Sequence, residues 1–322
     1  MVLEEIITQR SYETRPSYDL VYEWEDILLS HLDVKFSYDK EIRNKNKWVR
    51  RIPFSRYLLT SKPAFMFQMI GMRSVSCNKK NIVPHIIDFF IKDPKELKRF
   101  YSRYSEAQAV LVSSKEAYDF LCNNKCPLPL HHLALSISDK YALTTESSFS
   151  KEYDLVLMGR QNPILENFLK TYISDHPDFV YVFRKQENGE FNYYTSKGKK
   201  IGNINTRKEY IDLMRKAKVG LYATPGIDGG EVRTNGFSQV TPRLLEYIAC
   251  GCHVLARYTN NSDTDYYELN SICPSIDTYE DFAKRMDYCL NNPVDMKFYS
   301  DYLAKHYTTV RAKQLQEIIK DL

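Results

Sequence analysis

The chain has 322 residues, of which 43% are hydrophobic and 27% are charged. This ordinary apolar fraction excludes a wholly disordered, collagen-like or coiled-coil chain, and at about 100–200 residues per domain the length predicts two domains. The net charge of +4, from 45 basic and 41 acidic residues, is too balanced for a dedicated nucleic-acid coat, so we expect no nucleic-acid partner.

The cysteines and the N-terminus indicate a cytoplasmic chain. Seven cysteines show no CxxC pair and no Cys/His metal spacing, which is typical of a reduced compartment. The first ten residues carry acids where a signal peptide would need a basic and then an apolar run. No stretch approaches about 18 uninterrupted apolar residues, so we expect no membrane span.

The first half of the chain predicts strands that alternate with helices. Segment 64–72 fits either a strand or a helix, and Ser114 is a plausible N-cap because its hydroxyl can accept an N–H of the first turn. The other expected elements, in chain order, are a helix at 24–32, a strand at 81–91, a helix at 94–105, a strand at 109–113 and a helix at 115–122. Short apolar strands separated by helices favour a parallel sheet covered on both faces.

The segment Val34–Lys62 carries a strong excess of basic residues. It holds nine basic and two acidic residues, with five aromatic residues interleaved. Three interpretations stay open: a solvated loop, part of an anionic acceptor site, or a patch that makes peripheral contact with an anionic membrane.

The second half predicts a second α/β sheet. Its expected elements are strands at 153–158, 179–184, 219–223 and 253–258, helices at 163–174, 207–217, 241–250 and 279–290, and a hairpin within 185–203. Strands and helices that alternate in this order favour an α/β sheet.

Glycine placement predicts where a nucleotide would bind. Only Gly71 lies in the first 150 residues, and the other ten glycines lie between Gly159 and Gly251. A phosphate-binding turn needs glycine, because a side chain there would block the approach of the backbone to a pyrophosphate. The second half should therefore hold any nucleotide site.

The loop 224–240 is the strongest candidate for that site. It runs 17 residues, and loops of this length are usually functional. Thr241 is the expected N-cap of the following helix, Pro242 its first residue and Gly251 its stop. The loop contains four glycines, Gly226, Gly229, Gly230 and Gly236.

Charged side chains lie within this loop and directly after it. Arg233 and Arg243 are suited to bind phosphate oxygens, and Glu246, on the same helical face as Arg243, is suited to accept ribose hydroxyls. Gly159 lets the chain turn after strand 153–158, and Arg160 then presents a planar donor fork. The alternatives are a flexible loop, a surface Arg–Glu pair and an ordinary surface arginine.

The segment TPRLLEYIACGCHVL, residues 241–255, resembles the C-terminal signature of GT-B glycosyltransferases, particularly family 4 and the related group 1 and CgeB-like enzymes. The resemblance implies that Glu246 grips the donor ribose and that Arg160 reaches the diphosphate. Family 4 enzymes usually carry a second glutamate eight positions earlier, where this chain has Ser238. Glu231 either takes that role from a longer loop, or the role is absent.

The resemblance also bears on catalysis and metals. Asp88, in the apolar segment VPHIIDFF, is the acid–base candidate if a base is needed, with a purely structural role as the alternative. A DxD match such as Asp263–Asp265 is expected by chance in a chain of this composition. GT-B enzymes, moreover, neutralise the leaving diphosphate with cationic groups. We therefore expect no metal and no cofactor, with the nucleotide sugar as a substrate.

Together these features predict an α/β protein with two Rossmann-like GT-B domains facing across a cleft. The first, residues 1–148, would be short and bind a glycan or lipid-linked saccharide acceptor, and the second, residues 149–322, would bind the nucleotide sugar. The expected activity is glycosyl transfer, in the setting of bacterial surface polysaccharide assembly at the inner face of the plasma membrane. A GT-B nucleotide-sugar epimerase and a non-catalytic protein that binds anionic surfaces stay as alternatives.

Overall fold

The structure is a computed structural model that describes residues 1–322 apart from 12–17, 39–56, 59–61, 70–75, 78–80 and 188. The chain divides into two compact units, one of Met1–Asp139 with Tyr307–Leu322 and one of Lys140–His306. This differs from the expected division at residues 148 and 149. The boundary falls earlier, and the final helix, α12 (Thr308–Lys320), returns to the first unit because its apolar face packs into that unit's core.

The first unit is built on a six-stranded sheet in the order β2-β1-β4-β6-β7-β8, with every neighbouring pair parallel. The strands are β1 (Glu5–Thr8), β2 (Lys35–Tyr38), β4 (Ala64–Met69), β6 (Ile82–Ile87), β7 (Val110–Val112) and β8 (Leu130–His132). A separate parallel pair joins β3 (Tyr57–Leu58) to β5 (Ser76–Cys77). The ambiguous segment 64–72 is thus a strand where it is described, and its side chains Ala64 to Phe67 are buried on both faces.

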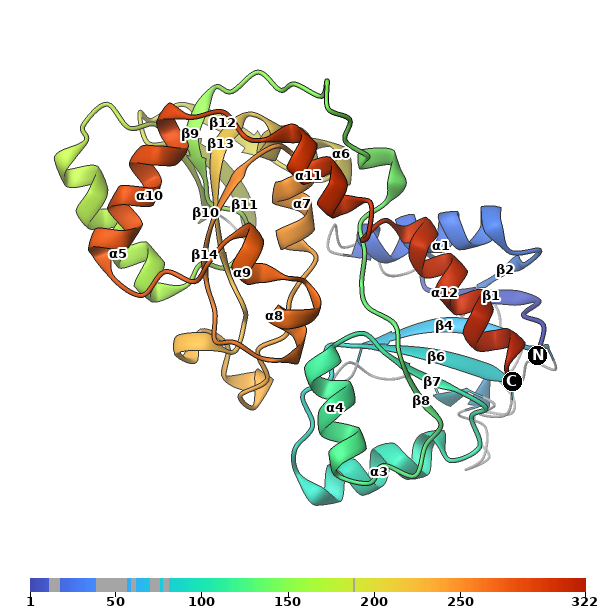
Figure 1. Cartoon of the computed structure of the whole chain (residues 1–322). Coiled ribbons are helices and arrows are strands. Elements are labelled where there is room, and N and C mark those ends of the chain that lie inside the picture. The colour runs from blue at the N-terminus through green and yellow to red at the C-terminus, as the bar shows by residue number, and fades with distance from the viewer. Residues whose placement is uncertain (12–17, 39–56, 59–61, 70–75, 78–80, 188) are drawn as a thin grey trace. The chain divides into compact units, whose positions relative to one another are not determined.

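Helices cover both faces of this first sheet (Figure 1). Helices α1 (Asp19–His31) and α12 pack with the strands around Trp24, Phe65 and Leu315. Helices α3 (Pro94–Tyr104) and α4 (Lys115–Asn123) follow β6 and β7, and the Ser114 hydroxyl caps α4 by accepting the N–H of Ala117, as predicted.

The second unit contains a mixed six-stranded sheet in the order β12-β11-β10-β9-β13-β14. Its strands are β9 (Tyr153–Val156), β10 (Tyr181–Glu187), β11 (Glu190–Thr195), β12 (Lys200–Asn203), β13 (Ala217–Ala223) and β14 (His253–Arg257). Strands β9, β10, β13 and β14 run parallel, and β10, β11 and β12 form the antiparallel extension that the expected hairpin at 185–203 predicted.

Helices pack against both faces of this sheet. The helices of the unit are α5 (Pro163–Asp175), α6 (Arg207–Arg215), α7 (Arg243–Ala249), α8 (Ser262–Tyr266), α9 (Leu269–Ile272), α10 (Tyr279–Asn291) and α11 (Met296–Leu303). Helices α5 and α10 pack against one face through Leu165, Phe282 and Val219. On the other face Tyr247 of α7 lies against Gly220, where an added Cβ would stand 2.3 Å from its ring. The helix therefore approaches β13 closely only because residue 220 lacks a side chain.

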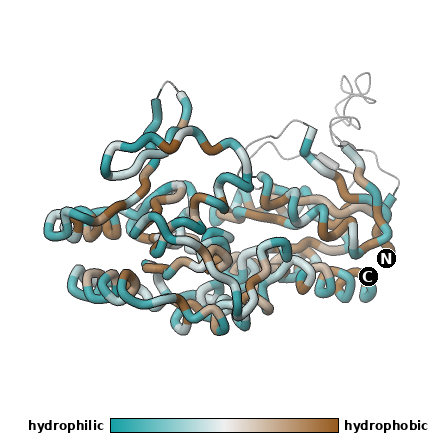
Figure 2. Tube along the Cα trace, turned by 90° about the horizontal axis from the view of Figure 1, so that it is seen from above, coloured by the Kyte–Doolittle hydropathy of each residue, from teal (hydrophilic) through white to brown (hydrophobic). Residues whose placement is uncertain are grey.

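Hydropathy follows this packing in each unit. Figure 2 shows hydrophobic and hydrophilic residues alternating along the helical turns, as expected for helices that each cover a sheet with one face. Across the described ranges, no helix combines the length and apolarity that crossing a bilayer would need. Most of Val34–Lys62, the basic-aromatic segment, lies outside the described residues.

Candidate functional site

The turn after β9 brings a glycine and a half-buried cation together. Gly159 has a φ of +68°, and a Cβ there would lie 2.3 Å from Nη2 of Arg243. Nη1 of Arg243 donates a hydrogen bond to the carbonyl oxygen of Arg160 at 3.3 Å. The predicted role of Gly159 is thereby sharpened: the missing side chain leaves room for a guanidinium at the carboxyl edge of the sheet, where α/β proteins bind ligands.

Arg243 is a permanent cation in a desolvated setting. It is the first residue of α7, and its Nε is shielded from solvent without a hydrogen-bond partner among the described residues. Burial works against its charge, yet Tyr210, Tyr247 and Glu246 together raise the pKa of Arg243 above its ordinary value. A half-buried cation with an unused donor next to an open turn is suited to hold an anion.

Glu246 forms a buried ion pair that the sequence did not reveal. Its Oε1 accepts a hydrogen bond from Nη1 of Arg207 at 2.6 Å, and the two side chains are 7% and 10% exposed. Arg207 is the first residue of α6, which a capping box between Thr206 and Glu209 starts at this point. The sequence signal was the arginine at the start of a predicted helix, but nothing in the pattern connects it to a residue 39 positions later.

Glu231 connects two of the predicted phosphate-binding arginines. Its Oε2 pairs with Nη1 of Arg160, and its Oε1 pairs with Nε of Arg233. The two arginine side chains are 60% and 68% exposed, whereas that of Glu231 is 12% exposed. The structure therefore brings these three predicted residues together, with a carboxylate between the two cations.

The glycine-rich loop is more ordered than its composition predicts. It contains two short 3-10 turns, Ile227–Gly229 and Val232–Thr234. Its two ends are joined by a 2.5 Å hydrogen bond between the Thr224 and Ser238 hydroxyls. Gly229 has a φ of +68°, which favours glycine, whereas the φ of −57° at Gly230 lies in the ordinary helical region.

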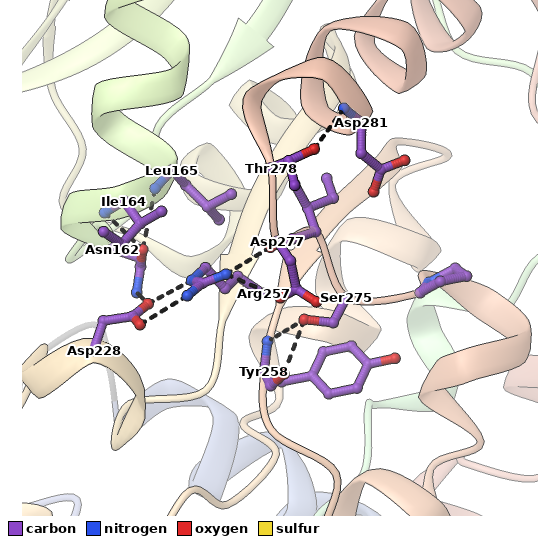
Figure 3. A network of polar contacts seen from close by, with 12 residues as sticks. Asn162, Ile164, Leu165, Asp228, Arg257, Tyr258, Ser275, Asp277, Thr278 and Asp281 are labelled. Carbon is purple, nitrogen blue, oxygen red and sulfur yellow. Dashed lines mark hydrogen bonds and ion pairs between the residues drawn. The ribbon is translucent and has the colours of Figure 1, made fainter.

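Asp228 anchors this loop to the sheet (Figure 3). Its carboxylate accepts hydrogen bonds from Nε and Nη2 of Arg257 at 2.6 and 3.0 Å, and from Nδ2 of Asn162 at 2.8 Å. The Arg257 hydrogen bond lowers the pKa of Asp228. Asn162 also caps α5, accepting the N–H groups of Ile164 and Leu165. The sequence analysis missed all three residues of this anchor, because they come from the loop, the end of β14 and the start of α5.

Thr241 does not have its predicted role as an N-cap. The helix begins at Arg243, with Pro242 in the cap position and no capping side chain. The N–H of Thr241 instead donates to the Tyr222 hydroxyl at 2.9 Å, which ties the loop to β13. Gly251 follows the helix with a φ of +60°, so the predicted stop is confirmed.

Asp88 belongs to the first unit and sits immediately after β6, with a φ of +56°. It is half-buried, whereas its neighbour His85 is fully buried, with Nε2 donating to the carbonyl oxygen of Leu133 at 2.8 Å. Burial lowers the pKa of His85 to about 3, so this imidazole is neutral and belongs to the core. The acid–base role of Asp88 stays a prediction, with a purely structural role as the alternative.

The motif Asp263–Asp265 lies at the start of α8, where Asn261 caps the helix and Asp263 is buried. Within the described part of the chain, no group of three or more His, Cys, Asp or Glu side chains is placed to hold a metal ion. The turn at the carboxyl edge brings together Arg160, Arg233, Arg243 and Glu231.

Comparison with known proteins shows a family similarity in the second half of the chain. Residues 160–317 match the family described as "Glycosyl transferase-like". Over this range the chain is similar to that family, and it has the GT-B fold. The match covers the turn at Arg160, the glycine-rich loop and α7, which are the elements that form the candidate site. No curated protein matches the sequence significantly.

Solved structures share the fold of this chain at low sequence identity. A glycosyltransferase from Rickettsia africae ESF-5 is 11% identical with a TM-score of 0.53, and the alignment covers 99% of this chain and 98% of that one. TarM from S. aureus is 10% identical with a TM-score of 0.50, over 79% of this chain and 55% of TarM. The pneumococcal O-GlcNAc transferase GtfA is 9% identical with a TM-score of 0.47, over 87% of this chain. This chain spans 59% of the length of GtfA.

Proposed function

We propose that the chain transfers a sugar from a nucleoside-diphosphate sugar to an acceptor hydroxyl. The observation that carries this proposal is the approach of Arg243 to the Gly159–Arg160 turn. It places a permanent, half-buried cation under a glycine turn at the carboxyl edge of a parallel sheet, with Arg160 and Arg233 beside it. The positive charges of these three guanidinium groups complement the negative charge of a diphosphate. Each group can also donate hydrogen bonds to phosphate oxygens through its planar N–H groups.

The chemistry of transfer explains why such a site suffices. The acceptor oxygen bonds to the anomeric carbon of the sugar while the bond from that carbon to the β-phosphate oxygen breaks. Negative charge then accumulates on the leaving nucleoside diphosphate, and preorganised cations stabilise it. Arg160, Arg233 and Arg243, with the backbone of Gly229 and Gly230, take this role in the proposal.

The proton of the acceptor hydroxyl needs a destination. We assign it to Asp88, which stands at the end of β6 in the acceptor unit, or to the departing phosphate if no base is used. Glu231 stays at the diphosphate end of the site, where its carboxylate pairs with Arg160 and Arg233 until the diphosphate engages them.

Glu246 holds the ribose in this proposal. A carboxylate accepts hydrogen bonds from two neighbouring hydroxyls, and Arg207 keeps that of Glu246 oriented by occupying Oε1. The pair therefore preserves an acceptor where the nucleoside is expected.

The donor and acceptor classes rest on chemistry and on one structural relative. The TarM structure contains UDP and alpha-GlcNAc-glycerol, which makes UDP the first nucleotide to test here. We propose a glycan or lipid-linked saccharide as acceptor, in bacterial surface polysaccharide assembly on the cytoplasmic side of the membrane. In this proposal, Val34–Lys62 makes the peripheral contact with anionic lipid.

A thermal-shift screen against UDP, GDP, CMP, dTDP and ADP tests the proposal. A ligand that binds only the native state raises the apparent unfolding temperature, so one nucleoside diphosphate should stabilise the protein. Arg160→Met should reduce this shift, whereas Arg99→Met, at an exposed position of α3, should leave it unchanged. Absence of a shift with all five nucleotides would refute the nucleotide site.

A further inference from the structure

A cavity opens at the edge of the second sheet opposite the Gly159 turn. It has a volume of about 400 Å³, which is within the range of small-molecule sites. Its lining includes Lys151, two residues before β9, Lys218, the second residue of β13, and His253, the first residue of β14. These parallel strands all begin at this edge, so the cavity, here called the amino-edge pocket, lies apart from the carboxyl-edge turn at Gly159.

The pocket combines an apolar wall with cationic groups. Phe149, Leu290 and Met296 supply apolar surface. The wall closes tightly over Gly251, where an added Cβ would lie 2.8 Å from the Phe149 ring and 3.6 Å from Cε of Met296. Of the described residues that line the pocket, two are lysines, one is a histidine and none is acidic.

Lys151 is the cation of this pocket whose charge is not balanced by a carboxylate among the described residues. Its ammonium donates to the carbonyl oxygen of Cys250 at 3.0 Å and lies 5.5 Å from the centre of the Phe149 ring. Across the described ranges no carboxylate forms an ion pair with it, and burial lowers the pKa of Lys151. Lys218, by contrast, pairs with Asp154 at 3.1 Å. A half-buried ammonium with no counter-charge, at the wall of a pocket, is a place where an anion gains binding energy.

We infer that the amino-edge pocket binds a small organic anion with an apolar body, such as an aromatic or short aliphatic carboxylate. The carboxylate supplies the missing counter-charge of Lys151, with Lys218 beside it, and the apolar body covers Phe149, Leu290 and Met296. A cation of the same shape meets two lysines and is rejected. This site is separate from the proposed donor site and does not rest on the proposed function.

Calorimetric titration of the full chain with 2-naphthoate tests the inference. We expect saturable binding of 2-naphthoate and no measurable binding of 2-naphthylmethylammonium, which has the same aromatic body and the opposite charge. Lys151→Met keeps the aliphatic stem and removes the charge, so it should weaken 2-naphthoate binding at least about tenfold, the loss of one hydrogen bond to a charged group. The matched control is Lys284→Met at an exposed position of α10, which should bind as the wild type does.

A second variant keeps the test decisive if Lys151→Met fails to fold. Val294→Trp, at a half-exposed lining position, should fill the pocket and abolish binding while the far-UV circular dichroism spectrum stays unchanged. The inference is overturned if 2-naphthoate does not bind the wild type. It is equally overturned if the ammonium analogue binds as well, if Lys151→Met or Val294→Trp binds normally, or if UDP displaces the probe competitively.

Discussion

Nη1 of Arg207 and Oε1 of Glu246 meet at 2.6 Å in the interior of the second unit, although 39 residues separate them in the chain. The pair joins the first residue of α6 to the middle of α7, whose first residue is Arg243. It thereby ties α6 to the helix that carries both Glu246, the proposed ribose ligand, and Arg243, the cation beside Gly159. The positions of the site residues therefore depend on how α6 and α7 pack as well as on the loop.

Removing one partner of this pair should destabilise the protein. Arg207→Met leaves Glu246 buried without its cation, and breaking a buried pair from one side costs about 3–5 kcal/mol. Urea unfolding followed by circular dichroism measures the loss. The double variant Arg207→Met/Glu246→Leu should recover part of it, because it leaves no uncompensated charge. A double variant that adds the two single losses would show that the pair is not coupled.

Gly159→Ala should weaken nucleotide binding more than its backbone strain alone predicts. The new Cβ would stand 2.3 Å from the Arg243 guanidinium, so that side chain must move. Gly198→Ala is the matched control, because Gly198 also has a positive φ, +84°, but nothing within 4 Å of the added atom. Both variants should lose about 1–2 kcal/mol of stability from the left-handed backbone. Only Gly159→Ala should raise the Kd of the nucleoside diphosphate, and equal Kd values for the two variants would contradict this.

Glu231→Gln should tighten binding of the nucleoside diphosphate. In the present structure the Glu231 carboxylate pairs with Arg160 and Arg233, the groups that the diphosphate would engage. The amide keeps the shape and removes the charge, so both arginines become available. Exposed ion pairs contribute about 0–1 kcal/mol, hence we expect a gain of up to about fivefold in affinity by calorimetry. Weaker binding in Glu231→Gln would instead show that the carboxylate positions the arginines for the ligand.

The protein should lose stability in acid when the carboxylate of Asp228 becomes protonated. Arg257 and Asn162 lower the pKa of Asp228 below its ordinary value of 3.8. A carboxylate with a lowered folded pKa contributes stability that is present above the unfolded value and is lost as the pH falls through the folded pKa. The loss therefore belongs to the range below about pH 4. Urea midpoints of wild type and Asp228→Asn should converge as the pH falls from 6 to 3, and a constant difference would exclude this linkage.

The sequence was sufficient for elements whose signals are local. Pro94 and Ser114 mark the starts of α3 and α4, and apolar runs mark β6, β7, β9 and β13, because caps and periodicity act over a few residues. The glycine distribution also located the candidate site in the second half. Position 159 was read as a turn glycine, and the structure adds the physical reason, which is the guanidinium beneath it.

The contacts between distant segments could not be predicted in this way. The pair Arg207–Glu246 and the anchor Asp228–Arg257 depend on how α6, α7 and β14 pack, and no local pattern encodes that packing. The return of α12 to the first unit was missed for the same reason. Thr241 shows the converse case, where a favourable local N-cap signal is overridden by a tertiary hydrogen bond to Tyr222.

The most direct test of the central claim is a calorimetric comparison of UDP and UMP binding in wild type and Arg160→Met. If Arg160 contacts the β-phosphate, the substitution should weaken UDP binding by about tenfold or more and leave UMP binding nearly unchanged. Arg99→Met should bind both nucleotides as the wild type does. Equal affinities of wild type and Arg160→Met for UDP, or equal losses for UDP and UMP, would contradict a diphosphate site at the Gly159–Arg160 turn.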